Sequence, residues 1–227
     1  MSSTKTALAA CFADVAKALG HPQRLDILEH LAQGERSVDA LAVRLDLPIA
    51  NVSQHLRVMR HAGLLGSRRE GKRVFYFLAD SSVVDLFSAL RRVGERNLAE
   101  VREILDGYYR ERDAFEPVSR KELVQRLKRG EVVVLDVRPE EEFVAGHVRD
   151  AINIPLKDLP RRLRDIPRDM DVVAYCRGPY CVFAFEAVVL LRGRGFTARR
   201  LEDGFPEWQA RGLPVQRLSK AGRHRPN

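Results

Sequence analysis

Two cysteines close together in the sequence are the residues best suited to covalent chemistry. Cys176 ends an apolar run, and the short loop Arg177-Gly178-Pro179-Tyr180 leads from it to Cys181. An apolar stretch of helical character begins near Val182, so the loop is expected at the positive end of a helix. Backbone N–H groups of such a loop would surround the sulfur of Cys176 and favour a nucleophilic thiolate. The pattern predicts a catalytic Cys176 supported by the backbone of Gly178, Pro179, Tyr180 and Val182.

The two residues that flank this loop add to its chemistry. Arg177 supplies a positive charge that attracts thiosulfate or another anionic sulfur donor. Cys181 could act as a redox partner by attacking a sulfur carried on Cys176, which would release sulfide and leave a disulfide within the loop. A small buried thiol at the start of a helix explains Cys181 equally well, so both interpretations stay open.

The C-terminal half has the pattern needed to position this loop. Residues 132–135 and 172–175 are short, apolar and rich in β-branched side chains, as buried parallel strands are. Helical stretches separate them, and Ser119-Arg120-Lys121-Glu122 is a capping-box pattern that begins a helix. Residues 119–217 are therefore predicted to form an α/β domain with a parallel sheet.

The N-terminal half carries a helix-turn-helix pattern. A short turn at Asp46-Leu47 separates two helical segments, and the second has an apolar face of Val52, Leu56 and Met59. Its other face offers small polar residues and an arginine, which suit readout of base edges in the major groove. The residues predicted to contact DNA from this helix are Ala50, Asn51, Ser53, Gln54 and Arg57.

A basic β-hairpin follows the second helix of this motif. Residues 64–69 and 74–78 flank the tip Glu70-Gly71-Lys72-Arg73, and the cations at the tip suit phosphate or minor-groove contacts. A long helix is then expected from Ser82 to about Tyr109, interrupted only by Gly94. The hairpin residues predicted to contact DNA are Arg68, Arg69, Lys72 and Arg73.

Composition and sequence pattern predict that the chain forms two domains. The 227 residues carry a formal net charge of +8, which favours an anionic partner such as nucleic acid. No apolar run has membrane-spanning length and the N-terminus lacks a signal peptide pattern, so a cytoplasmic protein without membrane contact is expected. The predicted parts are a mainly helical DNA-binding domain over 1–112, a linker over 113–118, the α/β domain over 119–217 and a disordered basic tail over 218–227.

The N-terminal half resembles the ArsR/SmtB family of winged-helix repressors. The residues that carry the resemblance are 19–28, with the sequence LGHPQRLDIL, and 52–65, with the sequence VSQHLRVMRHAGLL. The resemblance implies a homodimer that pairs through its first and last helices and binds a palindromic double-stranded operator. Metal-sensing members carry cysteines before the recognition helix or histidines in the last helix. Residues 35–41 lack the thiol and residues 85–109 lack the histidine, so no metal site and no cofactor are predicted.

The C-terminal half, residues 118–217, resembles a rhodanese domain. The matching segments are LDVR at 135–138, EFVAGHV at 142–148, AINIP at 151–155 and LEDGFPEW at 201–208. The resemblance implies transfer of sulfane sulfur through a persulfide on Cys176. Related phosphatases and arsenate reductases need an arginine where this chain has Val182, which argues against phosphate or arsenate chemistry. Asp203 stands where the family usually has glycine.

Three polar residues of the rhodanese-like half are interpreted as structural. Asp136, Arg138 and His147 lie in its matching segments, away from the loop in sequence. Arg138 is expected to pair with a nearby carboxylate such as Glu142. Catalysis is therefore assigned to the loop alone.

Together these patterns predict a dimeric transcriptional repressor that senses reactive sulfur or redox state through Cys176. The sulfur would come from a sulfane-sulfur donor such as thiosulfate or polysulfide. One alternative is a thiosulfate or persulfide sulfurtransferase with an accessory DNA-binding domain. Another is a repressor whose rhodanese domain only binds a partner. Retention of Cys176 and its glycine-containing loop counts against the last alternative.

Overall fold

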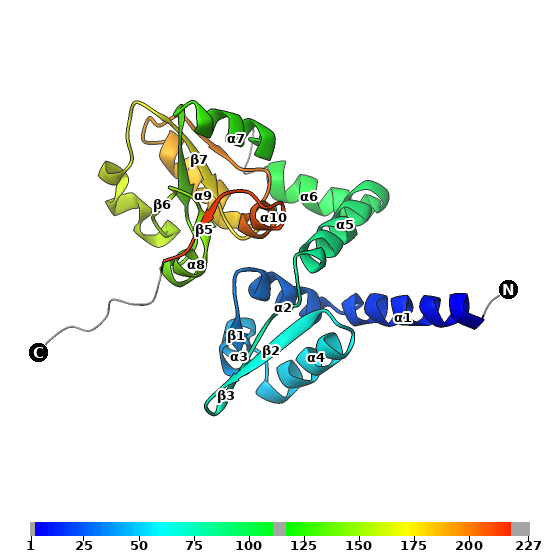
Figure 1. Ribbon diagram of the computed structural model, residues 1–227. Coiled ribbons are helices and arrows are strands. Elements are labelled where there is room, and N and C mark those ends of the chain that lie inside the picture. The colour runs from blue at the N-terminus through cyan, green and yellow to red at the C-terminus, as the bar shows by residue number, and fades with distance from the viewer. Residues whose placement is uncertain (1–2, 111–116, 219–227) are drawn as a thin grey trace, which may run out of the picture. The chain divides into compact units, whose positions relative to one another are not determined.

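The computed structural model describes residues 3–110 and 117–218 and divides into two compact units (Figure 1). Of the described residues, 3–84 form the first unit, and 85–110 with 117–218 form the second. The sequence placed the domain boundary near residue 112, whereas the division of the structure assigns 85–110 to the second unit. Among the described residues, no helix is long and apolar enough to cross a membrane.

The first unit is a winged-helix domain built from four helices and a small antiparallel sheet. Its strands follow the order β1-β3-β2. The buried core includes Ile27, Leu41, Val52, Leu56 and Met59, each without exposed surface. The elements are α1 (Ser3–Leu19), α2 (Pro22–Ala32), β1 (Arg36–Ser37), α3 (Val38–Leu45), α4 (Ile49–His61), β2 (Leu65–Glu70) and β3 (Arg73–Leu78).

Local sequence signals explain the turn between α3 and α4. The side chain of Ser37 caps α3 by accepting the N–H of Ala40. Asp46 ends α3 in the left-handed conformation, with φ of 52°, which an aspartate tolerates better than most residues do. Pro48 then precedes the first turn of α4. These signals confirm the predicted turn at residues 46–47.

The wing is a tight hairpin between β2 and β3. Glu70 pairs with Arg73, which leaves Gly71 and Lys72 as the turn. Gly71 has φ of 59°, a value that glycine adopts without the steric cost other residues incur. The predicted hairpin with its basic tip is confirmed.

The long C-terminal helix predicted after the wing is divided in two, and the predicted position of the break was wrong. Helix α5 covers Ser82–Asn97 and α6 covers Ala99–Arg110, so the break falls at Leu98 and Gly94 lies within α5. The side-chain amide of Asn97 donates to the carbonyl of Val93. Asparagine is a poor helix former because it competes for backbone groups in this way, which accounts for the position of the break.

The second unit contains a parallel four-stranded sheet in the order β6-β4-β7-β8. Helices and short 3₁₀ segments connect these strands, and β5 and β9 form a separate antiparallel pair. The elements are α7 (Arg120–Lys128), β4 (Val132–Asp136), α8 (Glu140–Ala145), β5 (His147–Val148), β6 (Ile152–Asn153), η1 (Leu156–Arg161), η2 (Leu163–Asp165), β7 (Asp171–Tyr175), α9 (Val182–Arg192), β8 (Ala198–Arg200), α10 (Phe205–Ala210) and β9 (Val215–Gln216).

Side chains of β7 alternate between two hydrophobic clusters, as they must on opposite faces of a strand. Val172, Ala174 and Cys176 belong to one cluster, which also contains residues of α9. Val173 and Tyr175 belong to the other, which contains Trp208 from α10. The alternation therefore fixes the side of the sheet on which Cys176 lies.

The predicted linker and tail fall mostly outside the described residues, which exclude 111–116 and 219–227. Val118, which the sequence placed in the linker, is fully buried and forms a parallel bridge with Leu201. Leu218, placed in the tail, donates its N–H to the carbonyl of Val144. These two residues therefore belong to the α/β fold.

Candidate functional site

The loop from Cys176 to Cys181 follows the carboxyl end of β7 and leads into α9. Cys176 is 1% exposed, and Cys181 is the N-cap residue of α9. The two cysteines form a disulfide, with their Cα atoms 6.1 Å apart. Between them, the N–H of Cys181 donates to the carbonyl of Gly178, which closes the loop as a tight turn. The structure thus brings together the two thiols that the sequence singled out.

Gly204, in the segment 201–208 that is here called the closing motif, lies directly against the loop from Cys176 to Cys181. The N–H of Phe205 donates to the carbonyl of Cys176 at 3.1 Å. A Cβ atom on Gly204 would lie 2.4 Å from the carbonyl carbon of Arg177 and 2.4 Å from the nitrogen of Gly178. No side chain fits between position 204 and the loop backbone, so the loop requires glycine at this position.

Arg177 is held by a buried carboxylate. Its Nη2 lies 2.7 Å from Glu142, and its Nε donates to both carboxylate oxygens of the same residue. Glu142 is 1% exposed, so this bidentate pair places a cation beside a carboxylate that is buried inside the protein. The charge of Arg177 is therefore balanced within the protein, and its predicted role in attracting an anionic donor has to compete with Glu142.

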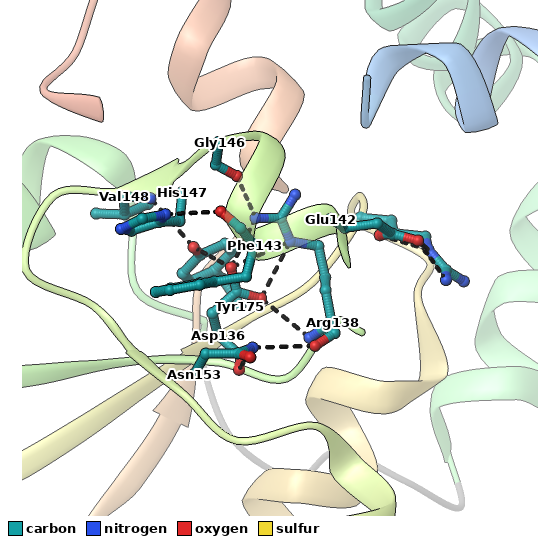
Figure 2. A network of polar contacts seen from close by, with 10 residues as sticks. Asp136, Arg138, Glu142, Phe143, Gly146, His147, Val148, Asn153 and Tyr175 are labelled. Carbon is teal, nitrogen blue, oxygen red and sulfur yellow. Dashed lines mark hydrogen bonds and ion pairs between the residues drawn. The ribbon is translucent and has the colours of Figure 1, made fainter. Parts of the chain in front are cut away.

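Arg138 and Asp136 form a fully buried ion pair (Figure 2). Arg138 Nη2 lies 2.6 Å from Asp136 Oδ2 and also donates to the carbonyl of Gly146 at 2.8 Å. Burial disfavours the charged guanidinium, but the charge and hydrogen bonds of Asp136, together with the charges of Tyr175 and Glu142, outweigh this effect and raise the pKa of Arg138. The sequence named Glu142 as the expected partner of Arg138. Asp136, the last residue of β4, is its salt-bridge partner here, and the charge of Glu142 also raises the pKa of Arg138.

Tyr175 and His147 complete this network (Figure 2). The Tyr175 hydroxyl donates to Asp136 and accepts the N–H of Val148 at 3.1 Å. Burial, and then the negative charge of Asp136, raise the pKa of Tyr175 well above its usual value. His147 Nδ1 lies 2.7 Å from the carbonyl of Phe143. These contacts join β4, β7, β5 and α8 and support the structural interpretation of Asp136, Arg138 and His147.

The unusual Asp203 forms an ion pair with the first residue of α7. Arg120 Nε lies 2.7 Å from Asp203 Oδ2. Burial raises the pKa of Asp203, and the positive charge of Arg120 opposes that rise. The replacement of the usual glycine thus connects the closing motif to the start of α7.

The recognition helix α4 presents the polar face that the sequence predicted. Ala50, Asn51, Gln54 and Arg57 are exposed and Ser53 is half-buried, whereas the apolar face of the same helix lies in the core. Behind this face, His55 Nε2 lies 2.8 Å from Gln23 Oε1. Burial, and then the nearby charges of His21 and Arg24, lower the pKa of His55. The contact with Gln23 therefore helps to fix α4 against α2.

The four basic residues predicted at the wing do not have equivalent surroundings. Arg68 forms ion pairs with Glu35 and Glu70, and its guanidinium lies 4.8 Å from the centre of the Phe75 ring. Hydrogen bonds to Glu35 and then Glu70 raise the pKa of Arg68. Arg69, Lys72 and Arg73 are exposed around the turn. The partner Glu35 lies far from Arg68 in sequence, and no periodic pattern joins them.

Comparison with known proteins agrees with both halves of this description. A family model described as "Helix-turn-helix domain" matches residues 19–68, and one described as "Rhodanese-like domain" matches residues 119–211. The HTH-type transcriptional regulator Rv0324 of Mycobacterium tuberculosis is 42% identical over 222 residues, which cover 97% of each chain. The chain belongs to the ArsR-type winged helix-turn-helix regulators with a C-terminal rhodanese domain.

Relatives of this regulator also match its halves separately. A protein named "Sulfurtransferase" from Allochromatium vinosum is 33% identical over 99 residues, which cover 43% of this chain and 92% of that protein. The homodimeric winged helix-turn-helix DNA-binding domain of a possible ArsR-family regulator from Mycobacterium bovis is 38% identical. It covers 44% of this chain and 93% of its own, with a TM-score of 0.41.

Proposed function

We propose that the chain is a dimeric transcriptional repressor whose operator affinity depends on the sulfur state of Cys176. The observation that supports this most strongly is the Cys176–Cys181 disulfide in the loop of a helix-turn-helix regulator. A rhodanese loop needs one thiol to carry sulfur, whereas a loop with two can also exist in an oxidised form. Two stable states of one loop are what a switch requires.

The reduced and the disulfide form of the loop are connected by a reaction that needs no reactant other than a persulfide donor. A persulfide donor RS–SH transfers its outer sulfur to the thiolate of Cys176, which leaves RSH and a persulfide on Cys176. The thiolate of Cys181 then attacks Sγ of Cys176 and expels hydrosulfide. Two cysteine thiols are oxidised to a disulfide, and the transferred sulfane sulfur is reduced to sulfide. The Cys176–Cys181 disulfide is the bond that these two steps would form, which supports this route.

Exposed apolar side chains support the dimer. Phe12 on α1 is 70% exposed and Val93 on α5 is 59% exposed, and Leu8 and Leu90 on the same helices are also exposed. Burying such residues against a second copy would recover about 1.5–3 kcal/mol each. We expect a two-fold dimer formed through α1 and α5, which matches a palindromic operator.

Within this proposal, the exposed residues of α4 read bases and the wing contacts phosphates. Gln54 and Arg57 have the side chains that form bidentate hydrogen bonds to adenine and guanine. Losing such a contact costs about 1–3 kcal/mol and relaxes sequence specificity. Ala50, Asn51 and Ser53 complete the exposed or half-exposed surface of the helix start.

The wing residues are expected to differ in their contribution to DNA affinity. Replacing Lys72 or Arg73 with alanine should weaken binding to all sequences and reduce the salt dependence of the affinity by about one phosphate contact. Arg68→Ala should change the salt dependence less, because Glu35 and Glu70 already balance its charge. Binding titrations at several salt concentrations measure both effects. Equal slopes for Arg68→Ala and Arg73→Ala would contradict the distinction.

The proposed function is tested by operator affinity in defined sulfur states. Operator DNA can be selected from random duplexes with the reduced protein, and its affinity then measured by fluorescence anisotropy. We expect polysulfide treatment to change that affinity by about tenfold and dithiothreitol to reverse the change. Such a change needs only about 1.4 kcal/mol of coupling. Identical operator affinities of the reduced, the polysulfide-treated and the re-reduced protein would refute the sensing function.

A sulfurtransferase with an accessory DNA-binding domain is the second candidate function. The observation in its favour is the 33% identity of the rhodanese-like half to a protein named "Sulfurtransferase". A thiosulfate:cyanide sulfurtransferase assay separates the two candidates. Catalytic turnover with an operator affinity that ignores sulfur state would favour the enzyme over the sensor.

A further inference from the structure

Helix α5 contacts the segment between the two loop cysteines. From Asp85 onward, α5 belongs to the same compact unit as the rhodanese fold. The hydroxyl of Tyr180 donates to Glu95 Oε1. The guanidinium of Arg91, one helical turn before Glu95, lies 5.4 Å from the centre of the Tyr180 ring. A Cβ atom on Gly178 would lie 3.6 Å from Arg91 Nη1. Two residues of the loop thus touch one face of one helix.

The same arginine is also anchored to the closing motif. Arg91 Nη1 lies 3.3 Å from Glu207 Oε1, and the two side chains are largely buried. Glu207 Oε2 in turn accepts the N–H of Gly204, whose backbone lies against the loop. Burial raises the pKa of Glu207, and the charge of Arg91 opposes that rise. Glu207 therefore holds Arg91 beside the loop, so a shift of the loop changes the contacts that Arg91 makes.

We propose that Arg91 and Glu95 couple the sulfur state of the Cys176–Cys181 loop to α5. The proposal rests on the sensing function above and names the residues that carry it. Helix α5 begins at Ser82, shortly after strand β3 of the wing ends at Leu78. Val83, in the first turn of the helix, is buried in the core of the winged-helix unit. A single helix thus connects the end of the DNA-binding unit to the side chains that hold the loop.

The coupling follows from the geometry of a short closed loop. With the Cys176–Cys181 bond formed, the positions of Gly178 and Tyr180 are restricted at both ends. Reduction removes the cross-link, which the persulfide form also lacks, and the loop then gains conformations in which the Tyr180–Glu95 hydrogen bond is lost. If the contacts with α5 favour one sulfur state of the loop by a given factor in the equilibrium, that sulfur state must favour the same contacts by the same factor. The redox equilibrium of the two cysteines therefore reports the coupling without any DNA.

The test uses the full-length protein and two variants, Tyr180→Phe and Glu95→Ala. Each removes the Tyr180–Glu95 hydrogen bond, and Tyr180→Phe keeps the ring beside Arg91. Glu103→Ala, at an exposed position of α6, is the matched control. In dithiothreitol redox buffers, we expect both variants to shift the Cys176–Cys181 equilibrium by about tenfold and the control to leave it unchanged. Both variants should also reduce the polysulfide response of operator affinity.

The outcomes separate this inference from the sensing function. A wild-type operator affinity that responds to polysulfide, together with variants that match it in response and in redox equilibrium, would overturn the coupling and leave the sensing function intact. A wild-type affinity that ignores polysulfide would refute the sensing function, while shifted equilibria in the variants would still support the contact. If the variants fail to fold, hydrogen exchange of α5 in reduced and oxidised wild-type protein decides the matter. Equal protection in both states would overturn the coupling.

Discussion

Replacing Cys176 with serine is expected to abolish both sulfur transfer and the response of operator affinity to polysulfide. A hydroxyl at this position can neither carry a persulfide nor form a disulfide with Cys181, and the two side chains are of similar size. Affinity for the operator in reducing buffer should stay within about twofold of wild type, because the substitution lies outside the winged-helix unit. Fluorescence anisotropy and the thiosulfate:cyanide assay measure the two losses.

Two further cysteine variants complete this experiment. Cys181→Ser should accumulate a persulfide on Cys176 that mass spectrometry detects after polysulfide treatment. Cys11→Ser is the matched control, since Cys11 is an exposed free cysteine on α1. A polysulfide response that persists in Cys176→Ser and disappears in Cys11→Ser would assign the sensing thiol to α1.

Replacing Arg138 with methionine is expected to cause a large loss of stability. Arg138 and Asp136 are fully buried, so the substitution leaves a carboxylate inside the protein without its cation. Breaking a buried pair in this way costs about 3–5 kcal/mol. Urea unfolding of the rhodanese unit, followed by the fluorescence of Trp208, measures the loss.

A surface ion pair supplies the control for this prediction. Arg162 and Asp165 form a pair whose side chains are 45% and 37% exposed. Arg162→Met should cost less than about 1 kcal/mol, because exposed pairs contribute little. A similar small cost for Arg138→Met would mean that water or another cation reaches Asp136, and the network would then lose its assigned structural role.

Local patterns in the sequence predicted the elements that position both candidate sites. The apolar run at 172–175 placed Cys176 at a strand end, and the apolar stretch after Cys181 predicted α9. The turn at residues 46–47 and the polar face of α4 followed from helical periodicity. These features depend on neighbours a few residues apart, which is the range that a periodic pattern describes.

The partners of the arginines could not be predicted in the same way. Arg177 binds Glu142 and Arg91 binds Glu207, and in both pairs the chain must fold before the residues meet. The spacing of residues in the sequence does not distinguish Glu142 and Glu207 from other carboxylates nearby. One usable signal was missed: Arg91 and Glu95 lie at i and i+4 on α5, so they share a face that a helix presents to a single neighbour.

Gly204 has a consequence for transplanting this chemistry to other scaffolds. Because its missing side chain makes room for the backbone of Arg177 and Gly178, the shape of the loop depends on a residue far from it in sequence. A graft of residues 176–182 onto another rhodanese scaffold would keep its geometry only with a glycine at the facing position. Protein engineers would therefore have to move residues 176–182 and 203–208 together, as one cassette of two segments.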